Sequence, residues 1–287
     1  AHRQIKVLRR VLIAVHQHRP EALALAADTA DWLRACGHEV ELPTSDAVIV
    51  SRPDLAREHV VGAGYDLALS IGGDGTMLRT VDLVSGDDVP VLGVNAGQLG
   101  YLVEIEPDAL RHAIERFFAG DHHIEARMRL DVRRAGHDGS VQALNEAVLE
   151  KTPSGHTVRL AVTVDGSYFM TFAADGLIVA TPTGSTAYAL SARAPVVAPT
   201  HRLLVLTPVA PHMLFDRSLV FEPSSELRLE VCSWRPAELY IDGRSEGVLS
   251  EGEAVLVTAS PHPARLVTFE RRDFLGILKH KFGLNDR

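Results

Sequence analysis

Short apolar runs alternate with amphipathic stretches through the first half of the chain. Continuous apolar runs are typical of strands buried in a parallel sheet. They occur at residues 11–16, 67–71 and 89–94, and a shorter strand is expected at residues 39–42. Helical spacing of apolar residues begins at Pro20 and recurs at residues 76–85 and 107–118, with a short helix expected at residues 54–61. This alternation predicts an α/β first domain with a doubly wound, mainly parallel sheet.

The pattern changes after Gly120 to short strands separated by Asp-Gly turns. The strands are expected at residues 160–164, 176–180, 203–206 and 254–257. This half therefore reads as a β-rich second domain. The tail turns helical again, and its apolar side chains fall on one side, which predicts packing on the first domain or on a partner subunit. We expect domains at residues 1–125 and 126–269, followed by a helical tail at residues 270–287.

Composition restricts the class of protein. The chain has 287 residues, of which 46% are apolar and 23% charged, as in soluble globular proteins. Its net charge of −8 gives no general attraction to nucleic acid or to anionic membranes. No apolar stretch reaches membrane-spanning length, and no signal peptide is visible. Cys36 and Cys232 lack CxxC spacing, so we expect buried, reduced thiols in a cytoplasmic protein.

The loop Gly72-Gly73-Asp74-Gly75-Thr76 joins a predicted strand to a predicted helix. A strand, a glycine turn and a helix N-terminus form a common phosphate site. A carboxylate repels phosphate, so Asp74 suits a different role, either taking a proton from a nucleophile or holding magnesium beside the phosphates. The alternative is a simple turn in which Asp74 or Thr76 caps the helix. Residues 95–102 form a second glycine loop after the next strand, and both loops should lie on one rim of the sheet.

Three polar groups stand out in the β-rich half. Asn145-Glu146 interrupts an apolar strand, so an inward carboxylate there needs a partner, unless the strand lies at an edge. Asp175-Gly176 precedes another strand and alone indicates only a turn. Residues 181–191 carry small hydroxyl residues, a glycine and Tyr188, which suits the base and ribose of a nucleotide. The alternative for this last segment is a helix capped by serine or threonine.

These motifs, in this order, resemble those of the NAD kinase family over nearly the whole chain. The motifs are Gly72–Thr76, residues 95–102, Asn145-Glu146, Asp175-Gly176, residues 181–191, residues 208–212 and Asp242-Gly243. The glycine-aspartate loop alone is shared with lipid kinases and phosphofructokinases. The resemblance implies an α/β domain, a β-rich domain and a C-terminal segment that returns to the first. It also implies transfer of a phosphoryl group from ATP, or from polyphosphate, to the adenosine ribose 2′-hydroxyl of NAD, giving NADP.

The resemblance also implies roles for individual residues. Asp74 would be the general base, and magnesium would arrive with ATP, without a protein metal site of its own. The implied nucleotide and phosphate contacts are Asp74, Gly75, Arg79, Asn145, Glu146, His156, Asp175, Thr186, Ala187, Tyr188, Ala189, Leu190, Ser191 and Arg244. Members of the family are commonly homodimers or homotetramers, so we expect one of these states.

Several features test this resemblance. The chain has neither a Gly-Lys-Ser/Thr P-loop nor a GxGxxG fingerprint in its first βα turn, which argues against P-loop kinases and Rossmann dehydrogenases. Arg193-Ala194 stands where the family has two glycines, and glycine there would permit a positive φ or a close backbone approach. Tyr101 replaces the usual phenylalanine. The Arg193-Ala194 pair motivates an alternative, a catalytically weak or inactive NAD(P)-binding regulatory protein. A lipid kinase is the third interpretation.

Overall fold

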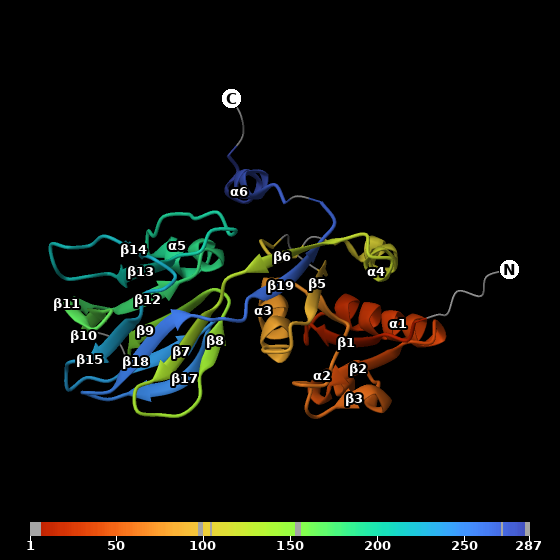
Figure 1. The fold of residues 1–287 in the computed structure, drawn as a ribbon, viewed down its shortest axis with the longest axis horizontal. Coiled ribbons are helices and arrows are strands. Elements are labelled where there is room, and N and C mark those ends of the chain that lie inside the picture. Colours follow the sequence, from red (N-terminus) through yellow and green to blue (C-terminus); the bar gives the residue numbers. More distant parts are fainter. Residues whose placement is uncertain (1–6, 97–99, 104, 153–155, 271, 285–287) are drawn as a thin grey trace. The chain divides into compact units, whose positions relative to one another are not determined.

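The computed structural model describes residues 7–96, 100–103, 105–152, 156–270 and 272–284. The chain divides into two compact units. The first unit comprises residues 1–126 and 264–287, and the second comprises residues 127–263. The first unit therefore contains both chain ends, and the second is a single continuous insertion (Figure 1).

The first unit is built on a seven-stranded sheet in the order β3-β2-β1-β4-β5-β19-β6. Its strands are β1 Arg10–Val15, β2 Glu39–Pro43, β3 Ala56–Arg57, β4 Leu67–Gly72, β5 Pro90–Asn95, β6 His123–Arg127 and β19 Ala264–Thr268. All pairs from β3 to β19 run parallel. The central strands β1 and β4 are almost wholly buried, which explains why their sequences are continuous apolar runs.

Helices cover both faces of this sheet. They are α1 Pro20–Ala35, α2 Thr44–Ile49, α3 Asp74–Leu83 and α4 Leu110–Phe118, with 3-10 turns η1 Pro53–Leu55 and η2 Pro107–Ala109. Helices α1 and α4 share a core with alternate strand residues such as Ile13 and Leu69. On the other face, a Cβ at Gly93 would lie 3.4 Å from the sulfur of Met77 in α3. The predicted doubly wound α/β domain is confirmed.

The second unit contains two six-stranded antiparallel sheets, in the orders β11-β10-β15-β18-β7-β8 and β14-β13-β12-β9-β16-β17. The strands are β7 Leu130–Arg134, β8 Val141–Ala143, β9 Glu146–Lys151, β10 Val158–Val164, β11 Ser167–Ala174, β12 Gly176–Ala180, β13 Leu204–Val209, β14 Leu219–Phe221, β15 Leu227–Val231, β16 Ala237–Ile241, β17 Arg244–Leu249 and β18 Ala254–Ala259. The 3-10 turn η3 Thr183–Thr186 and the short helix α5 Tyr188–Ser191 follow β12. Buried residues from both sheets, including Leu160 and Leu177, form one core, so the predicted β-rich domain is confirmed.

Four expectations from the sequence are wrong: the helix at residues 54–61, the end of the second domain, and the burial of Cys36 and of Cys232. Residues 54–61 form a 3-10 turn and strand β3 instead of a helix, and helix α2 precedes them unpredicted. Strand β19 pairs in parallel with β5, so the second unit ends at residue 263 and not at residue 269. An isolated apolar strand looks the same in sequence whichever sheet receives it. Cys36 is only partly buried and Cys232 is exposed.

The C-terminal helix α6, Phe274–Phe282, groups with the first unit, in agreement with the expected return of the tail. It is held loosely, because none of its residues is fully buried and Leu275 is 67% exposed. The guanidinium of Arg272, just before the helix, donates to the carbonyl oxygens of Tyr101 and Leu102. Over the described residues, no helix is long and apolar enough to cross a membrane.

Candidate active site

The glycine loop after β4 is shorter than its sequence indicated. Gly73 has extended backbone angles and caps α3, so the helix begins at Asp74, two residues before the expected start. The Asp74 carboxylate accepts hydrogen bonds from the backbone amides of Tyr101 (2.8 Å) and Leu102 (3.0 Å). Each carboxylate oxygen is therefore oriented by a separate amide, which fixes the group at the carboxyl end of the strand.

The two glycine loops meet, as the sequence predicted. A Cβ at Gly100 would lie 2.0 Å from Oδ1 of Asp74, and one at Gly72 would lie 2.3 Å from Oγ1 of Thr76. Only glycine allows such close approach, so both positions are explained by packing. Residues 97–99 of the second loop lie outside the part of the chain that the structure describes.

A cavity of about 490 Å³ opens beside Asp74. Its lining residues are Val15, His16, Gln17, His18, Arg19, Gly73, Asp74, Gly75, Thr76, Arg79, Gly100 and Lys281. Asp74 is the single carboxylate among these described lining residues, whereas Arg19, Arg79 and Lys281 bring positive charge. The N-terminus of the ten-residue helix α3 adds its own partial positive charge. The cavity therefore suits the phosphates of a nucleotide, with one carboxylate available for proton transfer.

Arg79, expected to face phosphate, lines this cavity, and its guanidinium also donates hydrogen bonds to Asp46 and Val15. Its Nη1 atom donates to Oδ1 of Asp46 at 2.9 Å, its Nη2 atom donates to Oδ2, and Nη2 also donates to the carbonyl of Val15. The Asp46 side chain is fully buried and also accepts from the Val15 amide. Sequence reasoning missed Asp46, because nothing in the short helix α2 distinguishes a buried aspartate from a surface one.

In the second unit, Asp242 fixes the Asn145-Glu146 pair. Its carboxylate accepts from the backbone amides of Leu144 (2.7 Å), Asn145 (2.8 Å) and Glu146 (3.0 Å). Glu146 begins β9, which lies between β12 and β16. The edge-strand alternative for this pair is therefore excluded.

Glu146 has an unusual environment. Its side chain is only 7% exposed, and its Oε2 atom has no hydrogen-bond partner among the residues that the structure describes. Burial, together with the charge of the neighbouring Asp242, raises the pKa of Glu146 to about 8. Burial also raises the pKa of Asp242, although its three amide contacts oppose this shift. A buried carboxylate oxygen without a partner is suited to receive a polar group from a ligand.

The hydroxyl-rich segment folds directly against Asn145. Oγ1 of Thr181 donates to the carbonyl of Leu144 at 2.6 Å and accepts from the amide of Gly184. A Cβ at Gly184 would lie 2.0 Å from the carbonyl oxygen of Asn145. The segment continues as the short helix α5, whose Tyr188 hydroxyl donates to Glu150 at 3.2 Å. Four further predicted contacts in this segment are at least partly exposed, namely Thr186, Ala187, Leu190 and Ser191.

The remaining predicted site residues differ from one another in their contacts and burial. Asp175 forms an ion pair with Lys151 at 2.7 Å. Burial raises the pKa of Tyr188, with smaller contributions from Glu150 and Asp175. Arg244 begins β17, and its charge opposes but does not outweigh the burial that raises the pKa of Asp242. Ala189 is fully buried in an apolar cluster, so any ligand contact would come from its backbone. His156 is exposed.

Arg193 adopts φ = 65°, in the left-handed region that favours glycine. Of the two reasons considered for glycine at this position, a positive φ or a close backbone approach, the backbone angle of Arg193 supports the first. The next residue, Ala194, is buried in the same apolar cluster as Ala189. The side chain of Arg193 is exposed.

Comparisons with known proteins agree with this geometry. The model of the ATP-NAD kinase N-terminal domain matches residues 11–122, and that of the C-terminal domain matches residues 144–269. The NAD kinase of Moorella thermoacetica is 37% identical over 281 residues, covering 96% of this chain and 89% of that protein. The NAD kinase of Heliobacterium modesticaldum is 38% identical, covering 94% of this chain and 96% of that protein.

Two solved structures share the fold. Yeast NADH kinase complexed with NADH superposes with a TM-score of 0.86 at 25% identity, covering 98% of this chain and 89% of that one. An NAD kinase from Archaeoglobus fulgidus in complex with ATP gives a TM-score of 0.72 at 26% identity, covering 96% of this chain and all of that one. Family models, relatives and fold agree over nearly the full length. The chain belongs to the NAD kinase family.

Proposed function

We propose that this chain transfers the terminal phosphoryl group of ATP to the adenosine ribose 2′-hydroxyl of NAD, giving NADP. One observation carries the proposal. Asp74, oriented by two backbone amides, is the single carboxylate among the described residues of a cavity whose lining includes three cationic side chains and a helix N-terminus. The NAD kinases to which the chain is similar support the choice of substrates.

In this proposal Asp74 acts as the general base. A ribose hydroxyl is a poor nucleophile near neutral pH, and a positioned carboxylate accelerates its attack by about 10²- to 10⁴-fold. The amides of Tyr101 and Leu102 hold the carboxylate in one orientation and leave one side of each oxygen for a substrate proton. Without this orientation the proton would have no fixed acceptor.

The phosphates of ATP would be bound by the cavity's cations and by the amides of Gly73 and Gly75 at the start of α3. Arg79 would contribute a guanidinium held at a fixed angle by Asp46. Phosphoryl transfer depends mainly on alignment and on charge neutralisation, and these groups supply both.

The proposal includes a magnesium ion that arrives with ATP. Among the described residues there is no group of three or more histidine, cysteine or acidic side chains that could hold a metal. Magnesium usually needs only one or two carboxylates when substrate phosphates supply further ligands. Because Asp74 is the proposed general base, the phosphates of ATP would hold the ion, as expected from the sequence. The ion would neutralise charge on the transferred group.

The second unit would bind NAD. Asn145, Glu146 and the segment Thr186–Ser191 would contact it, together with His156, Asp175 and Arg244. The unpartnered Oε2 of Glu146 suits a ribose hydroxyl or an amide of the dinucleotide. Further parts of the proposal are a cytoplasmic location and a homodimeric or homotetrameric state, which light scattering of the purified chain would test.

The direct test is to incubate the purified chain with NAD, ATP and magnesium and to measure NADP with an NADP-specific dehydrogenase. We expect NADP to accumulate, and polyphosphate should be tried as a second donor. Tight NADP binding without turnover from either donor would instead favour the regulatory alternative, which the strained Arg193 motivates. Because both matched family models are NAD kinase domains, the lipid kinase interpretation is not retained.

A further inference from the structure

The C-terminal helix contributes a lysine to the cavity of Asp74. Lys281 lies in the last turn of α6 and lines the cavity together with Asp74 and Arg79. Lysine is scarce in this chain, occurring at positions 6, 151, 279 and 281. The tail, which lies far from the glycine loop in sequence, therefore brings a long and flexible cation to the phosphate cavity.

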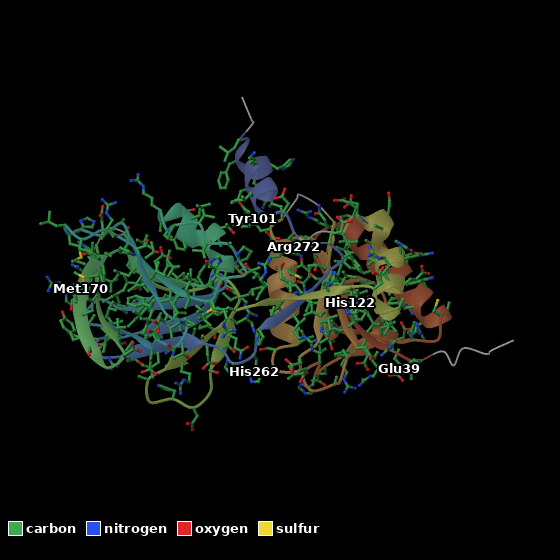
Figure 2. All side chains as sticks on the ribbon, turned by 45° about the horizontal axis from the view of Figure 1, so that its top comes forward. Glu39, Tyr101, His122, Met170, His262 and Arg272 are labelled. Carbon is green, nitrogen blue, oxygen red and sulfur yellow. The ribbon has the colours of Figure 1, made fainter. Side chains whose placement is uncertain are left out.

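The dipeptide Tyr101-Leu102 links this helix to Asp74. Its two amides donate to the Asp74 carboxylate, at 2.8 and 3.0 Å. Its two carbonyl oxygens accept from the guanidinium of Arg272, at 3.2 and 2.9 Å. Figure 2 shows Tyr101 and Arg272 close together below α6. Asp273 then caps the helix by accepting from the amide of Gly276. The direction of α6 is thus tied to the orientation of the carboxylate.

The Lys281 ammonium lies 3.9 Å from the centre of the Tyr101 ring. The helix has no fully buried residue, so its position depends on this contact and on Arg272 more than on packing. An exposed contact between an ammonium and an aromatic ring is weaker than a charge-assisted hydrogen bond to phosphate. A phosphate entering the cavity would therefore draw the ammonium away from the ring.

We propose that Lys281 binds the phosphates of ATP and that Tyr101 holds its ammonium at the cavity wall until ATP arrives. This inference rests on the proposed kinase function. A purely structural lysine would only fasten α6 to Tyr101. Lys281→Met separates the two roles, because methionine keeps an unbranched apolar side chain against the ring and removes the charge.

The first test measures the binding of inorganic tripolyphosphate to the full chain by titration calorimetry. We expect Lys281→Met to weaken binding about tenfold, and Lys281→Arg to restore most of it because arginine also binds phosphate. Lys279→Met, on the same helix but outside the cavity lining, is the matched control and should bind like the unmodified chain. Equal affinity of Lys281→Met and the control would overturn the assignment.

The second test measures steady-state kinetics of NADP formation. Lys281→Met should raise KM for ATP about tenfold and leave KM for NAD within twofold, because the lost contact is to phosphate. A rise of both KM values together would indicate a general loosening of α6 and contradict the proposal. If the chain formed no NADP at all, the proposed function would fail, while the tripolyphosphate titration would still decide the role of Lys281.

Discussion

At the scale of single residues, Glu146 is the group whose charge depends most on its surroundings. Its pKa lies near 8 in the folded chain, well above the ordinary value of 4.5, because it is buried beside Asp242. The folded state therefore holds a proton on Glu146 between about pH 4.5 and 8 that the unfolded chain has released. Stability must fall as pH rises through this window.

The substitution Glu146→Gln should remove this dependence of folding stability on pH. We expect the variant to unfold at a higher urea concentration than the unmodified chain at pH 9, and the difference to shrink or vanish at pH 5. Urea unfolding followed by circular dichroism at both pH values measures it. The exposed Glu251→Gln serves as control and should track the unmodified chain. A constant difference between Glu146→Gln and the unmodified chain at both pH values would refute the explanation.

Arg193 is a second residue with a clear energetic consequence. A side chain at φ = 65° is strained by about 1 kcal/mol relative to glycine, so Arg193→Gly should stabilise the chain by roughly 0.5–1 kcal/mol. Arg202→Gly, at another exposed position where φ is not positive, should give no such gain. Denaturant midpoints of the two variants provide the comparison. A destabilised Arg193→Gly variant would show that the arginine side chain makes a compensating contact.

At the scale of elements, Asp46 joins three of them near the cavity. Asp46 lies in α2. Its buried carboxylate accepts a hydrogen bond from the amide of Val15, at the end of β1, and another from the guanidinium of Arg79 in α3. Asp46→Asn should destabilise the chain by about 3 kcal/mol, since it leaves Arg79 without its ionic partner. It should also raise KM for ATP, because the guanidinium loses its fixed direction. Asp28→Asn, which breaks an exposed ion pair with Arg111, is the control and should change stability far less.

Most elements could be predicted from the sequence, because continuous apolar runs and helical spacing leave few alternatives for β1, α1 and β4. The exceptions have physical causes. Helix α2 has six residues, too few to show a helical period, and β19 carries no signal of the sheet that it joins. Asp74, Asn145 and Glu146 could be named as candidate site residues, because glycine and carboxyl groups are unusual after or within apolar strands. The contacts of Asp46 and the position of Lys281 at the cavity could not be predicted, since they depend on residues distant in sequence.

At the scale of the whole molecule, the net charge of −8 would by itself repel ATP. The positive charges of the cavity oppose this repulsion, because the same cavity is lined by Arg19, Arg79 and Lys281. At physiological ionic strength the distant charges are screened within about 8 Å, so the local cations dominate. The composition alone therefore gives no indication of the proposed nucleotide-phosphate site, which is inferred from its motifs and its geometry.

The central claim is that Asp74 takes the proton from the ribose hydroxyl. The most direct measurement compares the rate of NADP formation by the unmodified chain and by Asp74→Asn, with the exposed Asp108→Asn as control. We predict that kcat falls by about 10²- to 10⁴-fold in Asp74→Asn, that KM for NAD changes little, and that Asp108→Asn is unaffected. An Asp74→Asn variant with the turnover of the unmodified chain would contradict the account.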